Sequence, residues 1–508
     1  MAKTIVKRVI YIIISIALWI GVTSPLKTDV ESATVYAPAV PDIPVVIPFE
    51  NALVEYDEDE LIGMLFEASI SEISQLLESG VFTSEEITEY YLERIAKYNP
   101  EFNCFITLCD EALETAKLRD QQRARGEILG KLHGVPIVIK DNIDLEGYPT
   151  TNGENWRKNN IAADNAHVVQ KLIDAGAIII GKTNMSTMAD FAEHSISQVQ
   201  GETKNAYSFD HSPGGSSGGS AVAVSLNFAA AALGTDTNSS LRIPSAYAST
   251  VSLRTSYGLI DKDGVVPLVY DRDVVGTITR TVEDQALMLD VMTDNKYSFS
   301  DSLDADYLKG AKIGYIVELC ELTSDFPFNR SNVNMEILDV VNGAIKEMEE
   351  AGATIIGIDM PNLFYYNSTR SYDAIHSDLK RAFEKYDLDG IVFPSCLSTT
   401  PPSGFDANGE PLSLKCAFIN PVRYFSSPLG IPEICVPVGY TSDGLSIGME
   451  ILGLKGDDMT VLNVAYSYEQ ATHHRTPSSL APNLYEYGET DLDRYLFILN
   501  KKNNDLFV

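Results

Sequence analysis

Two hydroxyl-rich loops suggest that this chain carries out acyl chemistry. Pro213–Ser220 reads Pro-Gly-Gly-Ser-Ser-Gly-Gly-Ser, and Gly234–Pro244 reads Gly-Thr-Asp-Thr-Asn-Ser-Ser-Leu-Arg-Ile-Pro. Because glycine permits close backbone approach, the two loops can bring Ser216 or Ser217 next to Ser240. Clustered hydroxyls at a helix start suit a reaction in which a serine attacks a carbonyl group and nearby N–H groups hold the oxyanion. Such a reaction also needs a base.

Lys140 is the candidate base. It ends the apolar run Val135–Ile139, which predicts a buried strand, and ligands bind at the carboxyl ends of strands in open α/β sheets. A neutral lysine can activate a serine, which requires burial and a pKa lowered by roughly 2–3 units. Taken alone, Lys140 would be interpreted as an ion-pair partner of Asp141 or Asp144. The histidines lie at no metal-ligand spacing, so we expect no metal or other cofactor.

Two short motifs match other enzyme classes and are rejected. Gly176–Thr183 fits the phosphate-loop pattern, but apolar residues fill its interior, where a phosphate loop needs a glycine-rich turn after a strand. Gly214–Gly218 fits the Gly-x-Ser-x-Gly elbow of α/β-hydrolases, but Asn205–His211 before it is not the apolar strand that this elbow follows. The elbow would also leave Lys140 and Ser240 without roles.

The composition is that of a globular, strongly acidic chain. The 508 residues are 45% hydrophobic and carry a formal net charge of −33, which repels phosphate backbones and excludes nucleic acid as an expected partner. The six cysteines are scattered and form no Cys-x-x-Cys motif, so neither a metal site nor a disulfide framework is expected.

The N-terminal sequence predicts export. Basic residues precede the apolar run Val9–Val22, which is typical of a secretory signal and short for a membrane span. Because Pro25 follows the small residues at its end, an uncleaved membrane anchor stays an alternative. We therefore expect a signal peptide or N-terminal membrane anchor over 1–30 and a Pro-rich, acidic linker over 31–66. The protein would be secreted or anchored to the outer face of the cell membrane.

Helices and apolar strands alternate from residue 67 onward. The capping pattern of Thr83 and Glu86 opens one helix. Strands are expected at 134–140, 177–180, 229–234, 312–317, 353–358, 390–393, 433–437 and 446–452, and further helices at 111–125, 166–175, 220–226, 335–351 and 457–471. This alternation predicts an α/β fold with a mixed, largely parallel central sheet covered by helices on both faces. We expect one domain over 67–490 and a C-terminal tail over 491–508.

Several stretches of this sequence resemble the amidase signature family. They are Leu132–Asn142, Ala175–Met185, Gly214–Ser220 and Leu233–Pro244. The likeness covers about residues 69–471 and implies the amidase signature fold. It also implies a Ser–cis-Ser–Lys triad whose nucleophile lies 24 residues after the bridging serine. Since 240 − 216 = 24, the resemblance selects Ser216 over Ser217.

The resemblance implies a role for each of these residues. Lys140 would be the base, Ser216 a proton relay after a cis peptide bond, and Ser240 the nucleophile of a two-step acyl transfer. The backbone N–H groups of Thr237, Asn238, Ser239 and Ser240 would hold the oxyanion. The expected enzyme is an amidase that cleaves the carboxamide C–N bond of a small-molecule or peptide substrate.

Two other functions stay open. One is that of an amidotransferase-type subunit that works on glutamine, which the charge and the expected export disfavour. The other is that of a catalytically silent binding protein, because Asn238 and Ser239 replace the usual Gly-Gly of the family and would reshape the oxyanion loop. Arg254–Ser256, in place of Lys-Pro-Thr, and Thr187, in place of Glu, leave the triad intact. The amide substrate and the oligomeric state do not follow from the sequence.

Overall fold

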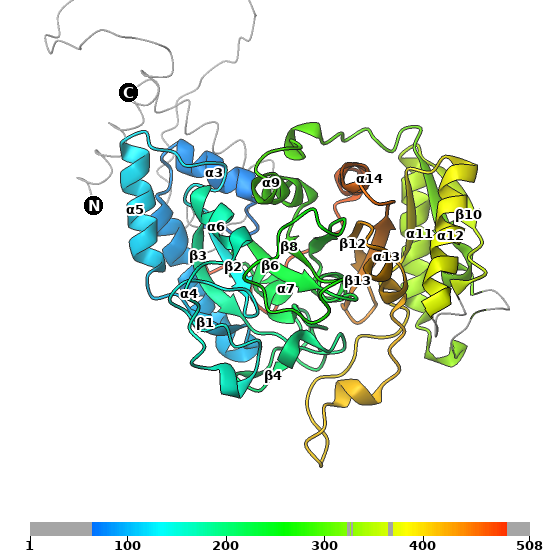
Figure 1. Ribbon diagram of the computed structural model, residues 1–508, viewed down its shortest axis with the longest axis horizontal. Coiled ribbons are helices and arrows are strands. Elements are labelled where there is room, and N and C mark those ends of the chain that lie inside the picture. The colour runs from blue at the N-terminus through cyan, green and yellow to red at the C-terminus, as the bar shows by residue number, and fades with distance from the viewer. Residues whose placement is uncertain (1–62, 323–325, 327–328, 364–368, 485–508) are drawn as a thin grey trace, which may run out of the picture. The chain divides into compact units, whose positions relative to one another are not determined.

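The computed structural model describes residues 63–322, 326, 329–363 and 369–484 (Figure 1). The chain divides into two compact units, one of which comprises Leu65–Leu77 and Phe82–Leu484. Nearly all of the other unit lies outside the described residues, as do the expected segment 1–30, most of the linker 31–66 and the tail 491–508. Within the described ranges, no helix is long and apolar enough to cross a membrane.

A sheet of 11 strands organises the larger unit, in the order β1-β3-β2-β6-β8-β7-β12-β13-β11-β9-β10. Its strands are β1 (Phe105–Leu108), β2 (Pro136–Lys140), β3 (Ile178–Thr183), β6 (Ala231–Asp236), β7 (Val251–Arg254), β8 (Val274–Thr279), β9 (Lys312–Ile316), β10 (Thr354–Ile358), β11 (Gly390–Pro394), β12 (Glu433–Tyr440) and β13 (Ser446–Leu452). A separate pair joins β4 (Ile196–Ser197) to β5 (Gly201–Glu202).

The sheet is mixed, as predicted, but its parallel share is smaller than predicted. Parallel pairing joins β3, β2 and β6 near one edge and β11, β9 and β10 near the other. The strands between them, from β6 through β8, β7, β12 and β13 to β11, pair antiparallel, as does β1 with β3. One reason is that β1, β7 and β8, which were not expected from the sequence, all pair antiparallel. The other is that the expected strands β12 and β13 follow each other closely in sequence and pair as an antiparallel hairpin.

Among the described residues, the helices include the six expected from the sequence and six that were not expected. They are α3 (Ile70–Glu78), α4 (Ser84–Phe102), α5 (Ala112–Ala124), α6 (His167–Asp174), α7 (Gly218–Ser225), α8 (Arg242–Ala248), α9 (Val282–Met292), α10 (Val317–Cys320), α11 (Met335–Glu350), α12 (Thr369–Tyr386), α13 (Ser426–Leu429) and α14 (Asp458–Thr472). The capping box that opens α4 is confirmed, because the Thr83 side chain accepts from the Glu86 N–H and the Glu86 side chain accepts from the Thr83 N–H.

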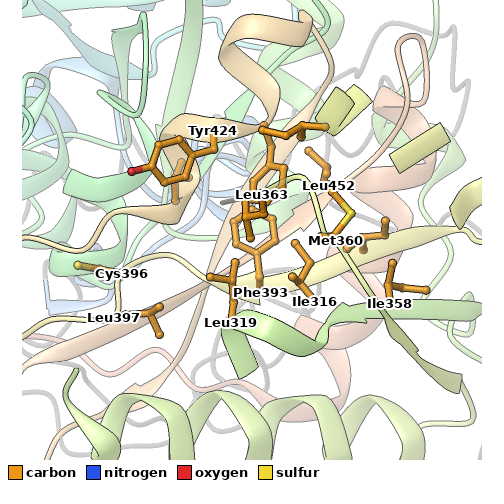
Figure 2. Packing of buried hydrophobic residues seen from close by; sticks show 14 of the residues in the cluster. Ile316, Leu319, Ile358, Met360, Leu363, Phe393, Cys396, Leu397, Tyr424 and Leu452 are labelled. Atoms are coloured by element: carbon orange, nitrogen blue, oxygen red, sulfur yellow. The ribbon is translucent and has the colours of Figure 1, made fainter. Parts of the chain in front are cut away.

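Helices cover both faces of the central strands. Every position of β2, β6, β8 and β13 is buried, and successive side chains of a strand point to opposite faces. Figure 2 shows one core cluster beside the sheet, in which Ile316, Phe393 and Leu452 from the strands meet Leu319 of α10 and Tyr424. Tyr424 belongs to the short turn Pro421–Tyr424, so this core fixes the segment that leads into α13.

Candidate active site

Lys140 lies at the carboxyl end of β2 and is fully buried. Its Nζ is 2.7 Å from the Oγ of Ser216 and 2.8 Å from the Oγ1 of Thr235. The ion pair considered for Lys140 alone is not formed with Asp141, because that carboxylate lies 3.7 Å from the Nζ of Lys182 and accepts from Thr151. Lys140 therefore faces hydroxyl groups at the edge of the sheet where the sequence predicted a site.

Burial changes the protonation of this lysine. Removal from water lowers the pKa of Lys140 from 10.5 to about 7, against the opposing effect of the Asp236 and Asp273 carboxylates. At neutral pH a large share of the side chain is thus the free amine, which can accept a proton.

Ser216 sits in the loop before α7, and the peptide bond that precedes it, Gly215–Ser216, is cis. A Cβ on Gly215 would lie 2.0 Å from the carbonyl oxygen of His194, so only glycine fits where the two backbones meet. The N–H of Ser186 donates to the Ser216 carbonyl over 3.2 Å. These contacts fix the loop and leave the Ser216 hydroxyl directed at Lys140.

Ser217 has a different environment from Ser216. Its Oγ donates to the Thr235 carbonyl over 3.2 Å and accepts from the Thr235 N–H over 3.3 Å. Its N–H donates to the Ser240 carbonyl over 3.1 Å. The side chain thus joins the two hydroxyl-rich loops through backbone groups, whereas the Ser216 hydroxyl is the one that meets the lysine.

Ser240 lies in the turn between β6 and α8 and is 6% exposed. Within the described part of the chain, its hydroxyl has no hydrogen-bond partner, and the N–H groups of Thr237, Asn238, Ser239 and Ser240 donate to no acceptor. We call Thr237–Ser240 the oxyanion turn. It combines an uncommitted hydroxyl with uncommitted N–H donors, which is what attack on a carbonyl group requires.

Each of the four residues of the oxyanion turn is anchored by at least one hydrogen bond. The Thr237 hydroxyl donates to Asp273. The Asn238 carbonyl accepts from Arg242 and Ser427, each over 2.9 Å. The Ser239 hydroxyl accepts from Asn420 over 2.9 Å, and the Ser240 carbonyl accepts from Ser217. Side chains and carbonyls are therefore bound from several elements, while the N–H groups remain available.

Asn238 and Ser239 do not force the turn into an unusual conformation. Neither has a positive φ angle, so the left-handed backbone that would favour glycine is not used here. Asn238 is exposed, and the Ser239 side chain is buried against Asn420. The backbone at these two positions therefore does not need glycine, and the Ser239 side chain contacts the segment before α13.

A buried charge cluster fixes both ends of the turn. Asp236 ends β6 and lies 3.0 Å from the guanidinium groups of both Arg242 and Arg254. Arg242 also pairs with Glu433 of β12. Burial alone would raise the pKa of the Asp236 carboxyl, but the two arginines outweigh burial and lower the pKa. Arg254, a departure from the family pattern, is thereby part of the support of the turn.

Neither rejected motif has the strand arrangement that its pattern requires. Residues 178–183 of the phosphate-loop pattern are strand β3, with the Lys182 Nζ bonded to the Pro149 carbonyl at 2.6 Å and to Thr150 at 2.9 Å. No strand directly precedes the Gly214–Gly218 elbow within the described residues. Of the residues that the structure describes, no cluster of histidine, cysteine or carboxylate side chains is suited to hold a metal ion.

Several groups around Lys140 and the oxyanion turn were not predicted from the sequence. The Thr235 hydroxyl contacts Lys140 and also accepts from Asn142 over 3.1 Å. Asp273 and Asn420 bind the oxyanion turn from segments 36 and 181 residues away. Thr235 and Asn142 lie inside the quoted motifs and could have been identified there. Asp273 and Asn420 lie in irregular segments without a recognisable pattern.

A buried, partly neutral lysine bonded to a serine, next to a turn of uncommitted N–H groups on a mixed α/β sheet, defines the class of amide-hydrolysing serine enzymes. The comparisons agree with this class. The family model described as Amidase matches residues 86–375 and 363–462, so the chain belongs to the amidase signature family.

The chain is similar to curated proteins and to solved structures of this family. The glutamyl-tRNA(Gln) amidotransferase A subunit of Alkaliphilus metalliredigens is 31% identical over 492 residues, covering 80% of this chain and 96% of the relative. The corresponding protein of Methanosarcina acetivorans is 32% identical, covering 78% and 95%. The peptide amidase of Stenotrophomonas maltophilia superposes with a TM-score of 0.68 at 26% identity, covering 82% of this chain and 99% of that chain.

Proposed function

We propose that this enzyme hydrolyses a carboxamide through an acyl-enzyme on Ser240. The observation that carries the proposal is the contact of the buried Lys140 amine with the Ser216 hydroxyl beside the oxyanion turn. Ser240 Oγ attacks the amide carbonyl carbon while its proton passes to Ser216 Oγ, and the Ser216 proton passes to Lys140 Nζ. The N–H groups of the oxyanion turn stabilise the charged oxygen of the tetrahedral intermediate.

The remaining steps return the proton. Protonated Lys140 donates through Ser216 to the leaving nitrogen, the C–N bond breaks, and ammonia or an amine departs. Water then attacks the ester carbonyl of the acyl-enzyme and gives its proton through Ser216 to Lys140. The bond between the acyl carbon and Ser240 Oγ breaks, Ser240 regains a proton, and the carboxylic acid leaves.

A panel of amides tests this proposal. It contains a peptide C-terminal amide, an aryl amide, an aliphatic amide and free glutamine. Wild-type enzyme is expected to release ammonia or amine from at least one of them, and Ser240→Ala to lose about 10⁴-fold or more in kcat. Ser217→Ala, which removes the neighbouring hydroxyl, is expected to stay within about tenfold of the wild type. Equal losses in the two variants would contradict the assignment.

The similarity to amidotransferase A subunits supports a second candidate function, glutamine hydrolysis within an assembly. The net charge of −33 argues against contact with tRNA. The panel separates the two functions. Turnover of amides other than glutamine by the isolated chain supports the hydrolase, whereas turnover of glutamine alone supports the amidotransferase role.

We also propose that the chain is exported, on the basis of the basic and apolar N-terminal sequence, Val9–Val22. Fractionation of expressing cells followed by N-terminal sequencing tests this. An exported protein lacking about the first 30 residues supports a cleaved signal, and an intact protein in the membrane fraction supports an anchor. Intact protein confined to the cytosol would contradict export.

A further inference from the structure

Asp273 is a buried carboxylate that the triad does not use. It is 7% exposed and directly precedes β8, which pairs antiparallel with β6. The register places Val274 opposite Asp236, so Asp273 lies beside Thr237, the first residue of the oxyanion turn. Strand pairing therefore brings this carboxylate to the active site from a segment remote in sequence.

The Asp273 carboxylate joins two segments. Its Oδ1 accepts from the Thr237 hydroxyl over 2.5 Å. Its Oδ2 accepts from the N–H groups of Leu268 and Val269 over 2.8 and 3.0 Å. Because both oxygens are held by N–H or O–H donors, the orientation of the carboxylate is fixed. Asp273 thus links the oxyanion turn to the loop over residues 255–272.

This link matters because Thr237 supplies an uncommitted N–H group. Oxyanion donors are effective only when they are held at the position where negative charge develops, and a displacement of about 1 Å can cost roughly 100-fold in rate. The side chain of Thr237 is tied by Asp273. Fixing that side chain restricts the rotation of the peptide group that carries the N–H.

We propose that Asp273 is a positioning residue of the catalytic site, which holds the Thr237 N–H in place for the oxyanion and acts through the Thr237 hydroxyl. The inference rests on the proposed function, since it assigns a role within the same acyl transfer. It differs from a purely structural role for Asp273, in which the carboxylate would only order the 255–272 loop.

The charge of Asp273 provides an independent readout. Two carboxylates act on Lys140, Asp236 from β6 and Asp273 from the segment before β8, and Asp236 is itself paired with Arg242 and Arg254. Both carboxylates favour the protonated lysine and so oppose the effect of burial on its pKa. Neutralising Asp273 should therefore lower the pKa of Lys140 and move the acid limb of the pH–rate profile to lower pH.

Four variants of the full chain test the proposal on the best substrate of the amide panel. Asp273→Asn keeps the size and removes the charge, Thr237→Val removes the anchored hydroxyl, and Thr237→Ser retains a hydroxyl. Asp271→Asn is the matched control, because Asp271 is an exposed carboxylate in the same segment. Thermal unfolding of each variant is measured so that rates are compared only between folded proteins.

The proposal predicts a specific pattern of rates. Asp273→Asn and Thr237→Val should each lower kcat by about 10- to 100-fold with KM changed less than about threefold. The double variant should be no slower than the slower single variant, because both changes break one contact. Thr237→Ser should recover most of kcat. Asp273→Asn alone should move the acid limb down by about half a pH unit or more.

Four results would overturn the proposal. Thr237→Val with a wild-type kcat, or losses that multiply in the double variant, would show that Asp273 does not act through Thr237. If Asp273→Asn and Asp271→Asn had the same kcat and the same acid limb of the pH–rate profile, Asp273 would have no role in catalysis. A wild-type chain that hydrolyses no amide and gives no adduct at Ser240 would overturn the proposed function, and this inference with it.

Discussion

Lys140 contacts hydroxyl groups instead of a carboxylate, and these partners favour the neutral amine that the proposed base requires. Nζ contacts Ser216 at 2.7 Å and Thr235 at 2.8 Å. A directly bonded carboxylate would stabilise the ammonium form and raise the pKa. The carboxylate next in sequence, on Asp141, is bonded elsewhere, to Thr151 and Lys182. Lys140 is therefore buried without an ion pair to the carboxylate of Asp141.

The pKa of Lys140 predicts the pH dependence of catalysis. With a pKa of about 7, the neutral amine becomes the major form as the pH rises through neutrality. We expect kcat/KM to rise about tenfold per unit below pH 6 and to level off above about pH 8. The pH–rate profile of the free enzyme measures this. A profile that is flat between about pH 5 and 9 would contradict Lys140 as the base.

The same lysine is expected to cost stability at neutral pH. Its folded pKa of about 7 lies below the ordinary value of 10.5, so between these values the unfolded chain binds more protons. The penalty is full below pH 7 and declines as the pH rises toward 10.5. At neutral pH this penalty to the free energy of unfolding is on the order of 4 kcal/mol. Replacing the lysine would remove the penalty but would also remove its two hydrogen bonds, so the net gain in stability is smaller.

The Lys140→Met variant should therefore unfold at a higher denaturant concentration than the wild type. At neutral pH the free energy of unfolding is expected to increase by about 2 kcal/mol, and the difference should shrink at about pH 9.5. Denaturant titrations at both pH values provide the measurement, and Lys158→Met, at an exposed lysine, serves as the control. A Lys140→Met variant that is less stable at neutral pH would show that the amine is not destabilising.

At the scale of elements, the site depends on the connection from β6 to α8. Asp236 ends the strand, its Oδ2 accepts from the Leu241 N–H over 3.1 Å, and Arg242 begins the helix. Arg242 also reaches Glu433 of β12 and the Asn238 carbonyl. One guanidinium thus connects a strand end, a helix start, a second strand and the oxyanion turn, which gives the turn its shape without glycine.

Removal of this guanidinium should be costly. Arg242→Met leaves Glu433 and part of Asp236 buried without their partner, and we expect a loss of about 3–5 kcal/mol in the free energy of unfolding. Arg125→Met, which breaks the exposed pair with Glu127, should have a far smaller effect, because solvent screens that pair. Urea titrations of both variants check the contrast. Equal costs would show that the buried cluster contributes no more than a surface pair.

Most long periodic elements of the fold could be predicted, whereas some regular elements could not. Helices α4, α6, α11 and α14 and strands β2, β3, β6 and β9–β13 match the expected ranges to within a few residues. β7 was missed because Val251–Arg254 is only four residues long and follows α8 almost directly. α9 was also missed, although Thr281, whose side chain accepts from the Asp284 N–H, marks its start.

The contact between Lys140 and Ser216 could be anticipated from the sequence for a related reason. Lys140, Ser216 and Ser240 lie in dense local motifs, and the structure places Ser216 beside Lys140. The replacement of Gly-Gly by Asn238 and Ser239 suggested a reshaped turn, because the backbone preferences of these residue types are known from the sequence alone. The contacts that hold the turn, from Asp273 and Asn420, depend on strand register and on an irregular segment, which local sequence does not reveal.

For the whole molecule, the net charge disfavours a nucleic-acid partner, whereas similar curated proteins are A subunits of glutamyl-tRNA(Gln) amidotransferase. The chain belongs to the amidase family and resembles amidotransferase A subunits at 31–32% identity. Its net charge of −33 creates a field that repels nucleic acids. The proposed hydrolysis of an amide by the chain itself fits both observations, because this reaction needs no contact with a nucleic acid.

Covalent labelling tests the central claim most directly. A serine-reactive fluorophosphonate is incubated with the wild type and with Lys140→Ala, and the adduct is located by mass spectrometry of peptides. We predict a single adduct on Ser240 in the wild type and labelling slowed by at least about 100-fold in Lys140→Ala. An adduct on Ser217, or a wild-type labelling rate without the Lys140 amine, would contradict a Ser240 nucleophile activated by Lys140 through Ser216.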